Sequence, residues 1–308
     1  MKKTLQIGAA ALILAVAVGG RSQTGPLAAA PAGGDKSSPS HTRSQSLFAP
    51  DNLVAWCIVP FDSLNRTPAE RIAMLQRLGF TQYAWDWRQK HLPDLPEEIR
   101  LSQVAGVRLR AVWLWIDYNS DQPGQLSAAN RTVIDAVLQA KLPVEYWVGF
   151  HANFFEGLDE PMKVRKGAAM IATIRDQAKI TNSTVNLYNH GDWFGEPDNQ
   201  IKIIKALGDP TVGLVYNFHH AHAQIARFPS LLPRMLPYLR VVNLDGLKPE
   251  GPMILPLATG TEERAMIRLL ETSGYHGAIG ILGHTEGEDV ELVLRRNLDG
   301  LRRIQETR

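Results

Sequence analysis

The sequence predicts one (β/α)8 TIM barrel, an α/β fold. From Leu53 onward, short apolar runs alternate with helical patterns of roughly 10 to 20 residues, which is typical of βα units and a parallel sheet. Eight such units follow one another with none left over, in about 260 residues, a usual length for this barrel. A doubly wound sheet could hold as many units, but eight complete ones favour the closed barrel.

The first unit has the clearest boundaries. A strand is expected in "LVAWCIVP", and the following helix begins after the N-cap Thr67, with Pro68 in its first position, and stops at Gly79. The later strands are expected at residues 81–87, 108–117, 143–150, 184–190, 212–220, 240–246 and 277–284. The later helices are expected at residues 96–106, 128–140, 161–179, 200–207, 262–273 and 290–304, with a proline-broken helical stretch after the sixth strand.

The N-terminus predicts an exported protein, periplasmic or extracellular. Lys2 and Lys3 precede an apolar run over residues 7–18, which has the length of a signal-peptide core and is too short to span a bilayer. We expect a signal peptide over residues 1–20 and no membrane span after its cleavage. Residues 21–49, rich in Ser, Pro, Gly and Ala, predict a disordered linker. The barrel domain is expected over residues 50–308.

Composition limits the partners. The formal net charge is +2 with acids and bases interspersed, so no basic stripe predicts nucleic-acid binding. Cys57 is the one cysteine, which excludes an intramolecular disulfide and a multi-cysteine zinc site, and its apolar neighbours favour a small core residue. A homo-oligomer is compatible with the sequence.

Polar side chains follow the predicted strands, and seven of the nine histidines lie at or just beyond a strand end. In such barrels the loops after the strands form one mouth, where catalysis occurs. An imidazole-rich mouth with tryptophans favours a small carbohydrate. The candidate catalytic residues are His190, His220 and Asp245. The candidate substrate-binding residues are Asp86, Trp87, Arg88, Trp115, His151, Asn189, Trp193, Asn217, Asn243 and His284.

Three local expectations follow from position alone. His219 and His220 should point to opposite faces of their strand, so that one of them at most enters the barrel. Glu145 begins its strand and should lie away from the mouth. Asp86 should form an ion pair with Arg88, two residues later.

Aromatic residues divide into two groups. Those expected to fill the core are Trp56, Trp85 and Trp113. Those near enough to the mouth to stack on a sugar ring are Trp87, Trp115 and Trp193.

Four segments in order, "LYNHGDWFGEP", "VGLVYNFHHAH", "VVNLDG" and "GTEERAMIRLLETSGYHGAIGIL", resemble the xylose-isomerase-like barrel superfamily over about residues 50–305. That group includes sugar-phosphate isomerases and epimerases and the endonuclease IV type of DNA-repair enzyme. The resemblance implies a barrel and proton transfer beside a sugar carbonyl. Typical epimerases of the group hold a divalent metal with a Glu, an Asp, a His and a Glu that end strands five to eight.

This sequence departs from that pattern at all four metal positions. Tyr188 stands at the first Glu, Asn217 at the Asp, Asn243 at the His, and Leu282 lies near the last Glu. The two amides keep hydrogen-bonding capacity without charge, as expected if sugar hydroxyls are bound directly.

The cofactor therefore stays open. A divalent metal would need a rebuilt site, and the candidate ligands are His151, His190, Glu196, His220 and His284. Imidazole ligands would favour zinc, iron or nickel.

The favoured function is an exported sugar isomerase or epimerase that abstracts a proton beside a carbonyl, with His190 or His220 as the base. Oxyanion donors would be Asn189, Asn217 or Arg88. Two alternatives stay open, namely a lyase of oxidised keto-glycosides and a catalytically inactive carbohydrate-binding barrel.

Two other functions are weaker. A hydrolase needs paired carboxylates, and no clear pair emerges from the candidates Asp86, Asp117, Glu145, Asp192, Glu196 and Asp245. DNA repair is opposed by the charge balance and by the missing metal ligands.

Overall fold

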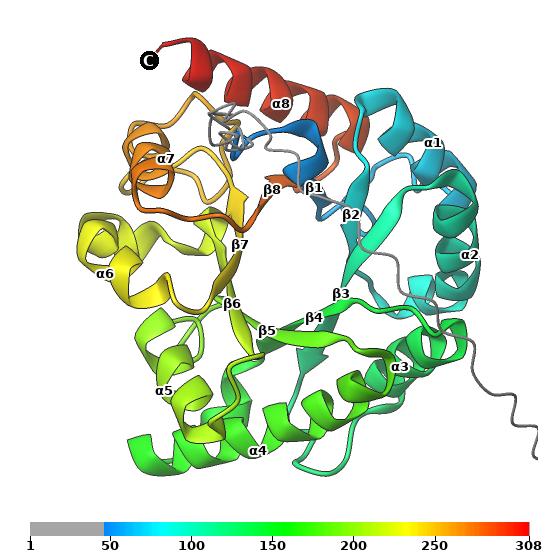
Figure 1. The fold of residues 1–308 in the computed structure, drawn as a ribbon, viewed down its shortest axis with the longest axis vertical. Coiled ribbons are helices and arrows are strands. Elements are labelled where there is room, and N and C mark those ends of the chain that lie inside the picture. The colour runs from blue at the N-terminus through cyan, green and yellow to red at the C-terminus, as the bar shows by residue number, and fades with distance from the viewer. Residues whose placement is uncertain (1–45, 308) are drawn as a thin grey trace, which may run out of the picture. The chain divides into compact units, whose positions relative to one another are not determined.

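The computed structural model describes residues 46–307, in which eight parallel strands close into a barrel in chain order and helices surround it (Figure 1). The predicted (β/α)8 barrel is confirmed. The strands are β1 (Leu53–Trp56), β2 (Gln82–Trp85), β3 (Arg108–Ile116), β4 (Glu145–Phe150), β5 (Thr184–Tyr188), β6 (Gly213–Asn217), β7 (Leu239–Leu244) and β8 (Ala278–Leu282). The helices are α1 (Pro68–Leu78), α2 (Leu95–Ala105), α3 (Ala128–Ala140), α4 (Glu160–Ala178), α5 (Pro197–Leu207), α6 (Phe228–Met235), α7 (Glu263–Thr272) and α8 (Val290–Glu306).

The predicted boundaries of α1 are confirmed by its caps. The Thr67 hydroxyl accepts the Glu70 N–H, and the Glu70 carboxylate accepts the Thr67 N–H at 2.9 Å, which completes a capping box. Gly79 ends the helix with φ of 80°, a conformation that favours glycine.

The sixth strand is shorter than predicted, and this changes the position of two histidines. β6 ends at Asn217, and His219 and His220 lie in a 3-10 helix, η5 (Phe218–His220). The Asn217 side-chain oxygen accepts the His219 N–H at 3.0 Å, which caps this helix. The expectation of opposite faces is therefore wrong, because strand alternation does not apply within η5, and the two rings lie 4.3 Å apart between centroids.

The N-terminal boundary of the packed domain also differs. The predicted signal peptide and residues 21–45 of the predicted linker lie outside the described residues. Residues 46–49 pack against the barrel: the Phe48 side chain is 6% exposed, and the Asn52 amide donates to the Leu47 and Gly277 carbonyls at 2.7 and 3.0 Å. The packed domain thus begins before residue 50. No helix within residues 46–307 is long and apolar enough to cross a membrane.

Large aromatic side chains fill the barrel interior. The Trp56 and Trp147 rings lie 4.9 Å apart between centroids, and the Trp113 and Tyr188 rings 4.8 Å apart. Gly149 on β4 makes room for this packing, since an added Cβ would lie 2.4 Å from the Trp113 ring. The aromatic layer forms a solid floor beneath the mouth.

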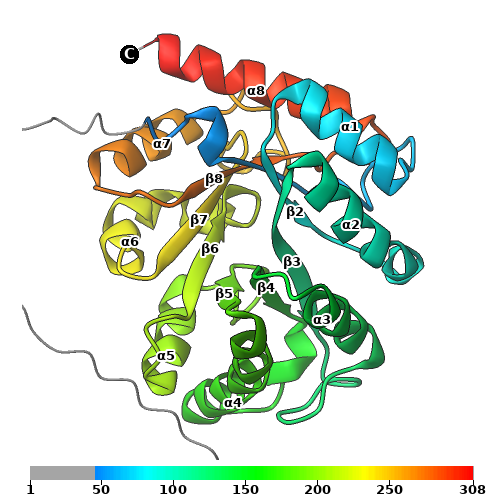
Figure 2. The ribbon, with the colours of Figure 1, turned by 45° about the vertical axis from the view of Figure 1, so that its right-hand side comes forward.

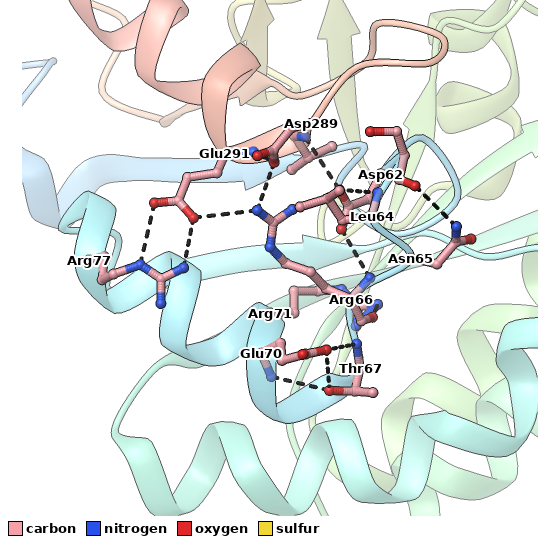
Figure 3. A network of polar contacts seen from close by, with 12 residues as sticks. Asp62, Leu64, Asn65, Arg66, Thr67, Glu70, Arg71, Arg77, Asp289 and Glu291 are labelled. Carbon is pink, nitrogen blue, oxygen red and sulfur yellow. Dashed lines mark hydrogen bonds and ion pairs between the residues drawn. The ribbon is translucent and has the colours of Figure 1, made fainter.

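The first and last units join where α1 and α8 lie side by side (Figures 1 and 2). Figure 3 shows Arg66 between three acidic residues at this junction. Its guanidinium contacts Asp62 and Asp289 at 2.7 Å each and Glu291 at 3.4 Å. Arg77 on α1 also contacts Glu291 at 2.7 Å. These pairs connect the loop after β1 to the start of α8.

Candidate functional site

A continuous group of rings lies at the carboxyl ends of the strands. The His190 ring, after β5, is 4.8 Å from Trp115 and 4.5 Å from His220, measured between centroids. His219 contacts His220 and lies 5.3 Å from His284, after β8. Side chains from β3, β5, β6 and β8 thus meet at one mouth, as the strand-end pattern predicts.

Further rings extend the group at both ends. His151 lies 6.1 Å from Trp115 between ring centroids, and Phe61 lies 3.5 Å from His284. The Arg88 guanidinium stands 5.2 Å from the centre of the Phe61 ring, within cation–π distance. Arg88 is thus the cation at this edge of the ring group.

Four imidazoles of the mouth, those of His190, His219, His220 and His284, have lowered pKa values, which favour the neutral ring. Burial, together with neighbouring imidazoles, lowers the pKa of His220 to about 2 and the pKa of His284 to about 4. Burial also lowers the pKa of His190 and His219. Neutral rings each offer one donor and one acceptor, so this group suits hydroxyls better than anions.

Asp86, after β2, is a buried carboxyl with one free oxygen. Its side chain is 3% exposed, Oδ1 accepts the Val59 N–H at 3.2 Å, and Oδ2 has no partner among the described residues. Burial raises its pKa to about 6, although the Val59 N–H and the charge of Arg88 oppose the shift. The expected ion pair is absent within residues 46–307: Arg88 instead donates to the Trp87 carbonyl at 3.0 Å and lies over Phe61.

Asp245, after β7, is a second carboxyl of the same kind. It is fully buried, and neither oxygen has a hydrogen-bond partner of good geometry in the described part of the chain. Burial raises its pKa well above the usual range, which favours the protonated form, although the backbone N–H groups of Gly246 and Leu255 oppose the shift.

Three of the positions where the resemblance implies metal ligands hold neutral side chains. The Tyr188 hydroxyl accepts from Trp56 Nε1 at 2.9 Å and from the Asn217 amide. Asn189 supports Asn217 by accepting its N–H at 2.6 Å. Asn243 is fully buried, and both its amide atoms lack partners among residues 46–307. Tyr188 therefore belongs to the floor of the mouth, beneath the histidines.

Three residues predicted to bind substrate or metal instead contact other parts of the protein. Trp193 packs 4.8 Å from the Phe155 ring and donates to Glu160 at 2.6 Å, so its contacts lie outside the ring group. Trp87 Nε1 donates to the Trp113 carbonyl at 2.8 Å, which supports the wall of the mouth from behind. Glu196 forms an ion pair with Arg227 at 2.6 Å.

The predicted metal ligands do not assemble into a metal site. Within residues 46–307, no three or more His, Cys, Asp or Glu side chains are placed to hold a metal ion together. Glu196 is held by Arg227, and His151 lies beyond Trp115 from the other imidazoles. The residues present therefore do not fit the divalent metal that the resemblance implies.

The other end of the barrel contains a cavity of about 740 Å³. Glu145 lines it, as expected for a residue that begins its strand, and forms an ion pair with Arg110 at 2.8 Å. Glu145 also accepts from Trp147 and Asn186 at 2.9 and 3.0 Å. We expect the residues at this end to contribute to stability rather than to catalysis, because catalysis in such barrels occurs at the opposite face.

Two residues at the mouth were not predicted there. Trp113 was expected in the core although it is partly exposed beside Trp115, and Phe61 lies in a loop. The stacking of Trp113 on Trp115 depends on Gly149, which stands opposite them on β4. A glycine within an apolar strand was the available signal.

No protein-family model and no curated protein matches the sequence. Several solved structures match the fold. A D-psicose 3-epimerase crystallised in the presence of D-fructose has 13% identity and a TM-score of 0.61, over 83% of this chain and 98% of that one. The 3-keto-D-glucoside 4-epimerase YcjR from E. coli has 12% identity and a TM-score of 0.61, over 83% and 99%. The IolI protein with a bound zinc atom has 9% identity and a TM-score of 0.64, over 83% and 98%. The chain therefore has the fold of the xylose-isomerase-like TIM barrel superfamily.

Proposed function

We propose that this protein is a sugar epimerase or isomerase that removes the proton from a carbon beside a carbonyl in a small carbohydrate. The observation that carries the proposal is the pair of buried carboxyls at the mouth, Asp86 after β2 and Asp245 after β7. Each has oxygen atoms without partners in the described structure, where a ligand's polar groups would be bound.

The two carboxyls lie in unequal environments, which suits an acid and a base partner. At pH 7, Asp86 is mostly ionised and can accept a proton, since its pKa is about 6. Burial raises the pKa of Asp245 well above the usual range, which favours the protonated form that can donate. Two such groups in unequal environments form a base and an acid at one working pH. The strands that carry them are separated by β8 and β1, so the two groups approach a substrate from different sides.

The other side chains of the mouth suit an uncharged sugar. The neutral rings of His190 and His220 offer donors and acceptors to hydroxyls, and the partly exposed Trp115 offers an apolar face. The deeply lowered pKa of His220 makes it a poor proton acceptor, so we assign the role of base to Asp86 rather than to a histidine. The fold neighbours that act on ketoses and keto-glucosides support this substrate class.

The same two carboxyls also suit an alternative function, a lyase that cleaves keto-glycosides. In a keto-glycoside, abstraction of the proton by Asp86 followed by protonation of the leaving oxygen by Asp245 would eliminate the glycosidic group. This lyase reaction needs one base and one acid, which the two carboxyls supply. The products separate the two functions, because epimerisation releases no alcohol.

The first test is proton exchange in D2O, followed by proton NMR with D-fructose, L-ribulose and methyl 3-keto-β-D-glucoside as probes. The protein should exchange the proton beside the carbonyl of at least one probe above the rate without enzyme. Asp86→Asn should lower this rate by about 10²–10⁴-fold, the usual contribution of a general base. The matched control Asp135→Asn makes the same chemical change at an exposed site on α3 and should not alter the rate.

Saturable binding of the sugars without exchange would contradict an enzyme and leave the carbohydrate-binding barrel. Exchange that survives in Asp86→Asn would remove Asp86 from the mechanism. Elemental analysis of protein purified without added metal or chelator provides an independent check. A stoichiometric transition metal lost on mutation of His190 or His220 would mean that the mouth rearranges into a metal site.

We also propose that the protein acts outside the cytoplasm, because of the basic and apolar N-terminal segment. Free or oxidised sugars, rather than sugar phosphates, would then be its substrates. Mass spectrometry of the protein secreted by an expressing cell should find a new N-terminus near Ala17 or Gly20.

A further inference from the structure

Cys57 lies where the proposed reaction needs a second acid. It directly follows β1, its side chain is 7% exposed, and it belongs to the apolar cluster of the barrel interior with Trp56 and Leu282. Its φ is 57°, in the left-handed region that residues other than glycine rarely adopt. This turn is followed by Val59, whose N–H holds the Asp86 carboxylate at 3.2 Å.

Two buried carboxyls follow strands on either side of β1, which stands between β2 and β7 in the closed strand order, with β8 beside it. Cys57 packs into the interior cluster at the ends of these strands, where Asp86 follows β2 and Asp245 follows β7. Asp86 Oδ2 and both oxygens of Asp245 are buried without partners among residues 46–307. The thiol therefore lies at the same end of the barrel interior as three buried oxygens without partners, where a ligand's polar groups would be bound. The thiol itself stays protonated, because burial and the charge of Asp86 raise its pKa.

We propose that Cys57 is a catalytic residue whose thiol protonates the carbonyl oxygen of the sugar while Asp86 removes the neighbouring proton. In a sugar, the carbonyl oxygen and the hydrogen on the adjacent carbon are close together. The acid that protonates the oxygen and the base that removes the hydrogen should therefore come from adjacent strands. Cys57 and Asp86 follow β1 and β2, which pair directly. This inference rests on the proposed function. In it, the neutral thiol polarises the sugar carbonyl, as the metal implied by the resemblance would do.

The step balances without any co-reactant. Asp86 takes the proton, the C–H electron pair forms the C=C bond of an enediol, and the carbonyl oxygen forms an O–H bond as the S–H bond of Cys57 breaks. The thiolate takes this proton back when the carbonyl forms again, and Asp245 delivers its own proton to carbon. Exchange with solvent then returns Asp86 and Asp245 to their starting protonation states.

The experiment compares Cys57→Ala and Cys57→Ser with the unmodified protein in the D2O exchange assay, with D-fructose and methyl 3-keto-β-D-glucoside as probes. The Ala variant should lose about 10²–10³-fold in kcat with KM changed less than about threefold, as for loss of an oxyanion donor. The Ser variant, a weaker acid that still donates, should fall between. Val54→Ala, a truncation in the same strand and interior cluster, is the matched control for packing and should keep its kcat.

A second readout does not depend on turnover. Cys57 is the one cysteine, so alkylation by iodoacetamide, followed by mass spectrometry of the intact protein, reports on this site alone. Saturating probe sugar should slow alkylation at least about fivefold if the thiol contacts the sugar.

The outcomes separate the two proposals. Exchange by the unmodified protein with a kcat for Cys57→Ala within threefold overturns the role of Cys57 and leaves the proposed function standing. Absence of exchange with every probe overturns the proposed function and the acid role with it. In that case slowed alkylation would still support a sugar contact at Cys57, and an unchanged rate would overturn it.

Discussion

At the scale of single residues, the burial of Asp86, the proposed base, lowers stability at neutral pH. Its carboxyl ionises at 3.8 in the unfolded chain and at about 6 in the folded protein. Because the folded pKa is raised, the unfolded state loses its proton first as the pH rises. The free energy of unfolding therefore falls between about pH 4 and pH 6 and stays lower above, by up to about 3 kcal/mol for a shift of roughly 2 units.

Asp86→Asn should remove this dependence, since an amide does not ionise. We expect the variant to be more stable than the unmodified protein at pH 7, by about 1–3 kcal/mol, and equally stable near pH 3. Urea unfolding at pH 3, 5 and 7 measures the difference, with Asp135→Asn as the control. A difference that is the same at all three pH values would show that the effect is steric. Activity should rise through about pH 6 as the base ionises.

At the scale of elements, the aromatic wall of the mouth depends on contact between β3 and β4. An added Cβ at Gly149 would lie 2.4 Å from the Trp113 ring, which stacks 5.9 Å from Trp115. Trp115 in turn contacts His190. The position of the Trp115 ring at the mouth is thus set by a glycine on the neighbouring strand.

Gly149→Ala should destabilise the protein by about 1–3 kcal/mol through overpacking, and should weaken sugar binding by moving both tryptophans. Urea unfolding and tryptophan fluorescence during titration with D-fructose measure the two effects. Trp113→Phe should relieve the clash, so the double variant should be less destabilised than the sum of the single ones. Additive effects would show that Gly149 and Trp113 do not interact.

At the scale of the whole molecule, the barrel must be closed between its first and last units. Arg66, whose side chain is 9% exposed, joins Asp62 to the start of α8 (Figure 3). Asp62 is 1% exposed in its side chain, so the loss of Arg66 would leave a buried carboxylate unpaired.

Arg66→Ala should therefore destabilise the protein by about 3–5 kcal/mol. The matched control is Arg100→Ala, which removes an arginine bonded to Glu97 at 2.6 Å on the exposed face of α2 and should cost less than about 1 kcal/mol. Thermal and urea unfolding of both variants give the comparison. Equal losses would mean that Arg66 acts no differently from a surface arginine.

Much of the site could be predicted from the sequence because strand ends are a local property. The alternation of apolar runs with helical patterns placed His190, Asn217 and Asp245 at one mouth before any distance was known. The extent of β6 could not be predicted, because the Asn217 side chain caps η5 and turns His219 and His220 to the same side. Asp86 was recognised as polar, but its burial and free oxygen depend on Val59 from another unit.

The sequence by itself determined the eight-unit barrel, the caps of α1 and the end of the barrel where polar residues gather, since periodicity and capping act over a few neighbouring residues. Tertiary structure alone decided that burial raises the pKa of Asp86, and that the predicted metal ligands within residues 46–307 stay apart. Protonation and ligation depend on burial and on distances between separate units, and both are fixed only when the barrel closes.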